Sequence, residues 1–224
     1  MRWNGWGEES ESMSLPPSGG EFLTSKVGAS DPLPSATWEE ALARVPSSRI
    51  ALEHPLLSLK AEDRLVHARG QSLPDWLAKK SGEMERYPDA LAFPESREEV
   101  AELMALALEQ QWHVIPYGGG TSVVGHINVP ASQKPVLTIS MARMNQLLKL
   151  DETSLLATFG AGTAGPDLEA QLRAHGYTLG HFPQSFEYST VGGWVAARSS
   201  GQQSLRYGRI EQLFAGGHME TMRG

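Results

Sequence analysis

The feature that most constrains this chain is a run of three glycines directly after a short apolar segment. Residues 112–115 have the character of a buried strand and continue into Pro116-Tyr117-Gly118-Gly119-Gly120-Thr121-Ser122. Glycine carries no Cβ, so consecutive glycines let the backbone turn sharply and approach a ligand closely. Successive N–H groups in such a turn form an anion-binding nest, to which the two hydroxyls add donors. The segment therefore predicts a pyrophosphate site, although three glycines alone are also typical of a flexible turn.

Helical and extended segments alternate from residue 87 onward. Residues 87–94 have the pattern of a short strand between prolines, and Ser96 with Glu99 predicts a capping box at the start of a helix over 97–111. Apolar residues in that helix recur at helical spacing. Three more strands are expected at residues 136–139, 147–150 and 155–159, and a further helix from Pro166 to a C-terminal cap at Gly176. This alternation predicts an α+β or α/β fold.

Residues 1–86 are predicted to form a mostly helical extension of a domain over residues 87–224. Residues 1–35 are rich in glycine, proline and serine and hold two tryptophans, so we expect a loosely structured arm that docks on the rest of the chain. Thr37 with Glu40 three residues later predicts a first short helix. Two more short helices are expected, one within residues 58–70 and one from Ser72 onward.

The composition excludes several classes of protein. Hydrophobic residues make up 40% and charged residues 20% of the 224 residues, as in a globular protein. The net charge is -7 and there is no basic stripe, which argues against nucleic acid as a partner. The seven histidines lack the spacing of metal ligands, so no metal site is expected. Without cysteine, a membrane-length apolar run or the apolar core of a signal peptide, the chain is expected to be cytoplasmic.

A second glycine-rich stretch competes with the first as a nucleotide site. Gly160-Ala161-Gly162-Thr163-Ala164-Gly165 fits the G-x-G-x-x-G pattern of dinucleotide-binding domains, follows an expected strand and opens an expected helix. Glu187 lies at about the spacing of the ribose-binding acid of such domains. The alternative is that these glycines only let a helix pack closely on a sheet. A phosphate loop of the NTPase type is not indicated, because no lysine precedes Thr121.

A third segment, residues 181–201, is dense in hydroxyl groups and glycines within an apolar context. Its side-chain and backbone donors suit a second stretch of a long ligand. A single dinucleotide-binding domain has no use for such a segment, whereas an extended cofactor laid across two subdomains does. The order of the three segments therefore favours the extended cofactor. His181 is expected either to face that cofactor or to satisfy a backbone group.

Several short motifs, taken in order, carry a resemblance to a known family. They lie at residues 2–7, 86–89, 115–123, 163–165, 168–169, 176–177, 180–181, 189–194, 198–201 and 207–211. Together they resemble the FAD-binding domain of the vanillyl-alcohol-oxidase superfamily. The finer pattern is similar to its alkyldihydroxyacetonephosphate synthase branch. The resemblance is dense from residue 87 onward and thin between residues 19 and 86.

The resemblance implies an α+β fold of the PCMH type, with two α/β subdomains of which the second is incomplete, and it implies FAD as the cofactor. The pyrophosphate would be held by Pro116, Tyr117, Gly118, Gly119, Gly120, Thr121 and Ser122. The rest of the cofactor would contact Gln184, Ser185, Phe186, Glu187, Tyr188, Ser189, Thr190, Ala197, Arg198, Ser199 and Ser200. For the Arg198 guanidinium, a structural ion pair is the alternative to a phosphate contact.

The resemblance further implies an enzyme of ether-lipid type, in which FAD takes part in exchanging the acyl group of acyl-dihydroxyacetone phosphate for a fatty alcohol. An FAD-linked oxidase or dehydrogenase of a 2-hydroxy acid or alcohol, and a non-catalytic remnant, stay open as alternatives. The family's cap domain and C-terminal catalytic residues are not in this chain. We therefore expect it to be truncated and to turn over no substrate, and assign no catalytic residue. A small-molecule or lipid-like substrate is expected, while peripheral membrane contact and a homodimer are left open.

Two glycines allow the competing loops to be compared. A β-branched residue at Gly119 is expected to abolish FAD binding and leave most of the fold intact, because the loop is expected at the surface. At Gly162 the same change is expected to impair folding first, since that glycine would permit helix–sheet contact.

Overall fold

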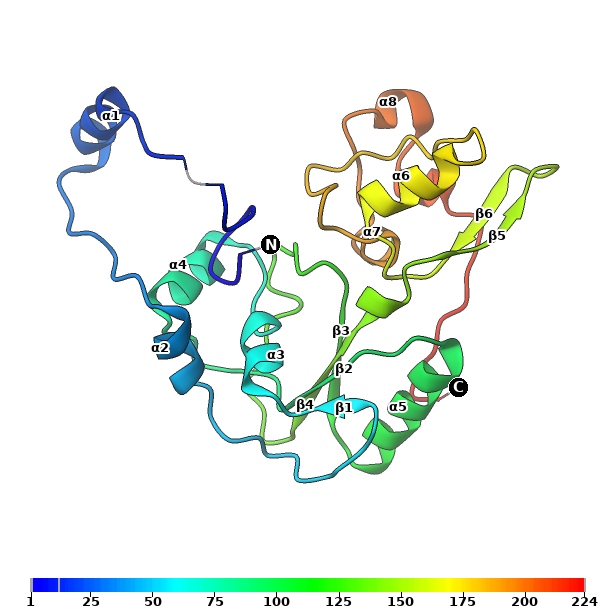
Figure 1. Ribbon diagram of the computed structural model, residues 1–224, viewed down its shortest axis with the longest axis horizontal. Helices are drawn as coiled ribbons and strands as arrows, with labels where there is room; N and C mark the ends of the chain where they lie inside the picture. The colour runs from blue at the N-terminus through cyan, green and yellow to red at the C-terminus, as the bar shows by residue number, and fades with distance from the viewer. Residues whose placement is uncertain (1, 12, 224) are drawn as a thin grey trace.

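The computed structural model describes residues 2–11 and 13–223, which form two lobes with an N-terminal arm (Figure 1). The sheet lobe, residues 37–143, contains a four-stranded sheet, and the hairpin lobe, residues 144–213, contains a two-stranded one. The C-terminal residues return to the sheet lobe, where Met222 packs against its core. This mixture of helices and sheets is the α+β architecture that the sequence predicts.

The sheet lobe has the strand order β1-β2-β4-β3. Strands β2 and β3 both run parallel to β4, whereas β1 is antiparallel to β2. The strands are β1 (Leu57–Ser58), β2 (Ala90–Ala92), β3 (His113–Tyr117) and β4 (Val136–Ser140). The three parallel strands end at the same edge of the sheet, and the glycine-rich segment follows β3 there. The predicted helical extension thus also supplies a strand, β1, to the sheet of the domain.

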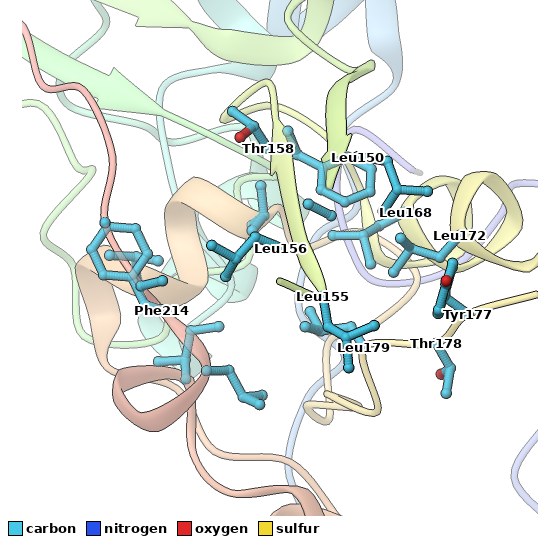
Figure 2. Close-up of a pocket in the computed structure, with 18 residues that line it drawn as sticks. Leu150, Leu155, Leu156, Thr158, Leu168, Leu172, Tyr177, Thr178, Leu179 and Phe214 are labelled. Carbon is cyan, nitrogen blue, oxygen red and sulfur yellow. The ribbon is translucent and has the colours of Figure 1, made fainter. Parts of the chain in front are cut away.

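The hairpin lobe pairs β5 (Leu147–Asp151) with β6 (Leu156–Phe159) in antiparallel fashion. Its helices are α6 (Gly165–Arg173), α7 (Val191–Ala197), α8 (Ser204–Tyr207) and α9 (Ile210–Leu213). A buried cluster of Leu168, Leu172, Trp194 and Ile210 joins three of them. An apolar cavity of about 530 Å³ lies between the hairpin and these helices (Figure 2). None of the residues that line this cavity belongs to the predicted FAD contacts.

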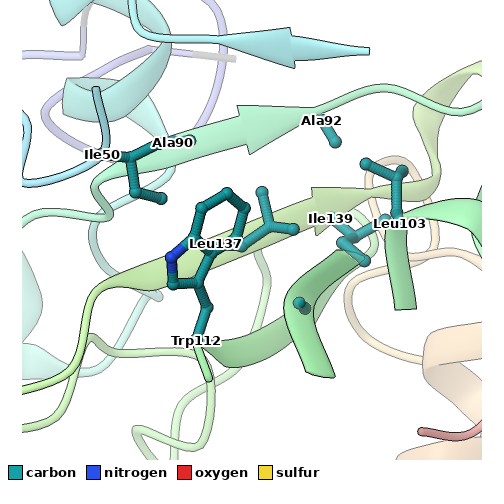
Figure 3. Packing of buried hydrophobic residues seen from close by; sticks show 8 residues of the cluster. Ile50, Ala90, Ala92, Leu103, Trp112, Leu137 and Ile139 are labelled. Atoms are coloured by element: carbon teal, nitrogen blue, oxygen red, sulfur yellow. The ribbon is translucent and has the colours of Figure 1, made fainter. Parts of the chain in front are cut away.

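One face of the four-stranded sheet is covered by α5 (Arg97–Glu109). Leu103 and Ala107 of this helix pack against Leu137 and Ile139 of β4, and Trp112 closes the cluster (Figure 3). Burial of each large aliphatic side chain contributes roughly 1.5–3 kcal/mol. The other face of the sheet packs on the chain that follows the glycine-rich segment, through a buried cluster of Ile115, Tyr117, Ile127, Val129 and Val136. The sheet is therefore buried on both faces, as is typical of parallel strands.

The predicted helix ends are close to the observed ones, with one difference in hydrogen bonding. Ser96 accepts a hydrogen bond from the Glu99 backbone N–H at 3.2 Å. The Glu99 carboxylate, however, accepts from the backbone N–H of Glu95 at 2.6 Å instead of that of Ser96, so the predicted capping box is only half formed. Gly176 confirms its predicted role after α6, since it takes φ +81° and its N–H donates to Arg173 O at 3.0 Å.

The described residues of the N-terminal extension form four helices, and the first of these corrects a prediction. The bounds are α1 (Pro17–Val27), α2 (Trp38–Ala43), α3 (Ala61–Val66) and α4 (Leu73–Ser81). The segment predicted to be loose contains α1, which begins with a proline in its first turn and buries none of its side chains, so no packing against the rest of the chain supports it. Both α2 and α4 begin with complete capping boxes. Within the described ranges, no helix has the length and apolar character that a membrane crossing requires.

Asp89 joins the starts of two neighbouring strands to the extension. Its buried carboxylate accepts hydrogen bonds from Arg49 Nη2 at 2.7 Å, Arg49 Nε at 2.9 Å and the backbone N–H of Val136 at 2.8 Å. Burial raises the pKa of this carboxyl, but the hydrogen bonds from Arg49 and Val136 outweigh that effect and hold the pKa below its ordinary value. The charged form of Asp89 is therefore the one that stabilises the fold.

We expect Asp89→Asn to lower the free energy of unfolding at neutral pH by about 2 kcal/mol, because a charge-assisted network becomes a neutral one and the half-exposed Arg49 keeps part of its solvation. A depressed carboxyl pKa contributes stability above its unfolded-state value of about 4, and this stability is lost as the pH falls through the folded-state value. The variant should therefore lose less stability than the parent on acidification below about pH 4. Urea unfolding at pH 7 and pH 3 measures both effects, and equal losses in the two proteins would contradict this role.

Candidate cofactor site

The glycine loop, residues 116–122, leaves β3 at the carboxyl edge of the parallel strands. In open α/β sheets, ligands bind outside this edge. Gly120 takes φ +69°, a backbone conformation that favours glycine. A Cβ at Gly120 would overlap the ring of Tyr117, so glycine is required here for two reasons.

The backbone N–H groups of the glycine loop are free to bind a ligand. Among the residues that the structure describes, none accepts a hydrogen bond from the N–H groups of residues 118–122. Unpaired backbone donors are costly when buried, and successive ones at a turn suit an anion. The donor set therefore fits the pyrophosphate of a dinucleotide cofactor.

The C-terminal end of the glycine loop is held by Gly70 and Gln71, which precede α4, and by a residue of α4 itself. The backbone N–H of Gln71 donates to Ser122 O at 2.7 Å, and that of Gly70 donates to Asn128 Oδ1 at 3.0 Å. Asn128 in turn donates to the buried Asp75 carboxylate at 2.7 Å. Sequence reasoning found only the helix start at Ser72 and missed this support. The one available signal was an acidic residue at the third position of that helix.

Lys79 lies one turn beyond Asp75 on α4 and is also buried. Burial lowers the pKa of its ammonium group to about 8, and the charge of Asp75 offsets part of that effect. Together with Arg69, whose Nη1 lies 3.7 Å from Asp75 Oδ1, it balances the charge of the buried carboxylate. The support under the glycine loop is therefore a compact set of paired charges.

The predicted contact segment 184–190 packs directly on the glycine loop. A Cβ on Gly119 would overlap the carbonyl oxygen of Tyr188, and a Cβ on Gly118 would overlap Thr190 Oγ1. Residues of the two lobes that are about 70 positions apart in the sequence are thus in backbone contact. The structure brings residues 116–122 and 188–190 together, as a ligand that spans both would require.

The predicted contact segment 197–200 lies at the C-terminal end of α7, whereas residues 184–190 precede that helix. Thr190 caps the start of this helix by accepting from Gly193 N–H at 3.3 Å, and Arg198 ends it in the left-handed region with φ +52°. The exposed Arg198 guanidinium lies 3.7 Å from Glu211, so the ion pair considered as the alternative is present. Ala197 and Ser200 are exposed and Ser199 is partly buried. The predicted contacts 184–190 and 197–200 therefore flank one short helix.

In the described ranges His181 pairs with no backbone group, so that one of its two expected roles is wrong, whereas a position facing the cofactor stays a prediction. The ring is buried, and Nε2 lies 2.7 Å from the hydroxyl oxygen of Ser199, which is a side chain and not a backbone group. Burial lowers the pKa of this imidazole, so it is neutral at physiological pH. Its ring packs against Trp194 with the ring centres 5.0 Å apart.

The competing glycine stretch serves packing. A Cβ on Gly162 would overlap Met141 O, one on Gly160 would overlap Met144 O, and one on Gly165 would overlap Phe186. The preceding strand β6 belongs to an antiparallel hairpin, whereas the dinucleotide-binding motif follows a strand of a parallel sheet. The packing alternative therefore holds, although the partners are the backbone of the turn at Met141–Arg143 and the Phe186 segment, not a helix on a sheet.

The N-terminal arm reaches the same site. The Trp6 and Tyr188 rings meet edge to face with their centres 5.1 Å apart, and Tyr188 Oη donates to Glu8 Oε1 at 2.8 Å. Trp3 packs edge to face on Trp38 at 5.8 Å, which anchors the arm to α2. The start of the arm thus docks on the rest of the chain as expected, and one of the residues it contacts, Tyr188, is a predicted cofactor contact.

No metal centre is indicated in the parts of the chain that the structure describes, because it holds no cluster of three or more His, Asp or Glu side chains that could bind an ion. The predicted contacts are mainly backbone donors, hydroxyls and aromatic rings, with Glu187 and Arg198 as exposed charged side chains. Such a set suits a phosphate-bearing organic cofactor, and no two of these side chains form an acid–base pair in the described ranges.

Comparison with known proteins defines the class. A family model described as "FAD binding domain" matches residues 88–224. This chain belongs to that family of FAD-binding domains, and FAD is its cofactor. The match begins one residue after the predicted start of the domain.

Particular relatives refine this assignment. Alkyldihydroxyacetonephosphate synthase of Dictyostelium discoideum is 36% identical over 248 residues, covering 95% of this chain and 41% of that protein. A solved structure of an alkyldihydroxyacetonephosphate synthase has a TM-score of 0.82 at 33% identity and covers 95% of this chain and 46% of that one. D-lactate dehydrogenase (cytochrome) 1, mitochondrial, of Saccharomyces cerevisiae is 31% identical over 129 residues, covering 57% of this chain and 22% of that protein. The chain spans about two fifths of the synthase it matches. These similarities confirm the resemblance and the PCMH-type fold.

The contact between Gly119 and Tyr188 corrects the expectation that a side chain at Gly119 would spare the fold. We expect even Gly119→Ala to displace residues 188–190 and to lower Tm by roughly 2–12 °C, since forced overpacking costs about 1–3 kcal/mol and each kcal/mol shifts the Tm of a chain of this length by about 2–4 °C. Thr121→Ala in the same loop removes atoms without creating a contact and should change Tm by about 1 °C or less. Thermal unfolding followed by circular dichroism compares the two, and a Gly119→Ala protein as stable as Thr121→Ala would show that the loops are not in contact.

Proposed function

We propose that the glycine loop holds the pyrophosphate of FAD and that residues 184–190 and 197–200 contact the rest of the cofactor. The observation that carries this proposal is the row of unpaired N–H groups at residues 118–122, at the carboxyl edge of the sheet and against residues 188–190. Each charge-assisted N–H contact contributes roughly 1.5–3 kcal/mol, so three or four of them suffice for tight binding. The glycines let the loop approach residues 188–190 closely, because a Cβ at Gly118 or Gly119 would overlap Thr190 or Tyr188.

We further propose that the whole protein is an enzyme of the alkyldihydroxyacetonephosphate synthase type, with this chain supplying the cofactor-binding part. The support is the extent of the similarity, because the synthase matches 95% of the chain and so includes the N-terminal extension. The substrate would then be a lipid-like ester of dihydroxyacetone phosphate, whose acyl group is exchanged for a fatty alcohol. Since the described site offers no acid–base pair, the 224-residue chain alone should turn over no substrate.

An FAD-linked dehydrogenase of a 2-hydroxy acid is the second candidate, favoured by the similarity to D-lactate dehydrogenase over a shorter stretch. The two candidates separate in one experiment on the protein encoded by the complete gene. Under anaerobic conditions, a dehydrogenase bleaches its flavin when D-lactate or glycolate is added, whereas an acyl–alkyl exchange enzyme releases fatty acid from acyl-dihydroxyacetone phosphate with no net flavin reduction. Bleaching by a 2-hydroxy acid would favour the second candidate over the first.

Thr121→Asp tests the pyrophosphate site. The Thr121 side chain makes no hydrogen bond to another residue in the described ranges, so the change breaks no internal contact. A carboxylate here would repel the pyrophosphate by about 4 kcal/mol at 4 Å and an effective dielectric constant of about 20. We expect the Kd for FAD, measured by flavin fluorescence, to rise at least about tenfold.

Val124→Asp is the matched control, because it places the same charge two residues after the glycine loop, at a residue that is 76% exposed. Its affinity for FAD should stay within about twofold of the parent value, since a solvated and screened charge interacts weakly. Equal effects of the two substitutions would indicate a general charge effect and would refute a pyrophosphate site at residues 116–122.

A further inference from the structure

Two serines that flank α7 are each held by a ring nitrogen from the core of the hairpin lobe. Trp194 Nε1 donates to Ser189 Oγ at 2.7 Å, and His181 Nε2 lies 2.7 Å from Ser199 Oγ. Both rings are almost fully buried, with exposures of 2% and 1%, and they pack against each other. One serine precedes α7 and the other follows it, so one pair of rings supports both ends of the helix.

The direction of the first hydrogen bond follows from chemistry alone. An indole N–H can only donate, so Ser189 Oγ must be the acceptor. The hydroxyl hydrogen of Ser189 then has to point elsewhere. No residue in the described ranges accepts it, although Ser189 is only 5% exposed. A nearly buried donor is therefore left for a group outside this part of the chain.

The direction of the hydrogen bond between His181 Nε2 and Ser199 Oγ depends on the surroundings of the other imidazole nitrogen, Nδ1. His181 Nδ1 is buried and has no hydrogen-bond partner among the described residues. A neutral imidazole carries its hydrogen on one nitrogen only, and buried N–H groups without an acceptor are rarer than buried acceptors without a donor. The hydrogen therefore lies on Nε2, which donates to Ser199 Oγ. The Ser199 hydroxyl is then also directed outward as a donor.

We propose that Trp194 and His181 are positioning residues, which fix the hydroxyls of Ser189 and Ser199 as outward hydrogen-bond donors to acceptor atoms of a cofactor lying along α7. Identification of that ligand as FAD rests on the proposed function. FAD suits the arrangement because its phosphate oxygens, flavin carbonyl oxygens and ring nitrogens are acceptors. Ser189 directly follows Tyr188, whose carbonyl oxygen contacts the glycine loop, so its donor lies beside the pyrophosphate site.

A double-mutant cycle tests the Trp194–Ser189 half. Ser189→Ala removes the donor, and we expect the Kd for FAD to rise by about three- to tenfold. Trp194→Phe keeps an aromatic ring in the core but releases the Ser189 hydroxyl, so the Kd should rise by a similar factor. In the double variant, Trp194→Phe should add no further loss, because there is no hydroxyl left to orient. Circular dichroism confirms that each variant is folded.

Independent, multiplicative losses in that cycle would mean that Trp194 acts on stability and not through Ser189, and would overturn this half of the proposal. If Trp194→Phe does not fold, Trp194→Tyr replaces it, because this variant also lacks the indole N–H. Its effect on the Kd for FAD should likewise not add to that of Ser189→Ala.

Nitrogen-15 NMR of the His181 imidazole in the ligand-free chain tests the other half and requires no cofactor. The expected result is a neutral ring with its hydrogen on Nε2. A hydrogen on Nδ1 would make Ser199 the donor to the imidazole and would overturn its outward role. Because this measurement is made without FAD, it is independent of the proposed function. Failure of the unaltered chain to bind FAD would instead refute the proposed function and leave the imidazole result to decide the orientation of Ser199.

Discussion

The candidate site depends on how closely the glycine loop approaches residues 188–190. At Gly119 the loop leaves no room for a Cβ, because the Tyr188 carbonyl oxygen occupies that position. This backbone contact joins the sheet lobe to the hairpin lobe. It requires that Gly119 has no side chain, so the glycines matter for the site as much as its hydrogen-bond donors do. On its other side the loop is held through Ser122 by Gln71, above the buried pair of Asp75 and Asn128. The loop is thus fixed from both lobes, and its free N–H groups are ordered before a ligand arrives, which lowers the entropic cost of binding.

The chemistry of the site also depends on backbone donors and small side chains more than on charged side chains. The chain carries a net charge of -7, yet the loop suits an anion, because the donors are backbone N–H groups and hydroxyls whose orientation does not depend on the overall charge. The hydroxyl oxygen of Ser189 accepts a hydrogen bond from Trp194 Nε1, and that of Ser199 lies 2.7 Å from His181 Nε2, so each differs from an ordinary surface hydroxyl in having a buried ring nitrogen as a partner. Flavin chemistry requires further groups that the described site does not supply. The described residues are therefore assigned the cofactor-binding part of the proposed enzyme.

Much of the fold could be predicted from local sequence signals. The alternation of apolar strands with capped helices located β2, β3, β4 and α5 to within about three residues, because strand and helix periods and caps are local properties. The exposed helix α1 was missed, since its glycine and serine content resembles that of a loop and no buried face marks it. The glycine loop was recognised from its strand, glycines and hydroxyls. Its contact with Tyr188, its support by Asn128 and the two ring nitrogens behind the serines could not be predicted, because each joins residues whose proximity depends on the tertiary fold. For the same reason the G-x-G-x-x-G stretch was ambiguous until β6 was seen to be antiparallel.

The most direct test of this account is a nitrogen–proton NMR titration of the 224-residue chain that follows the backbone N–H signals of the glycine loop. Addition of FAD should shift the signals of Gly118, Gly119, Gly120, Thr121 and Ser122 strongly, as expected for new hydrogen bonds to phosphate oxygens. Riboflavin, which lacks the pyrophosphate, should leave these five signals nearly unchanged. The account would be contradicted if FAD left them in place and instead shifted the signals of residues 160–165, since the second glycine stretch would then hold the phosphates.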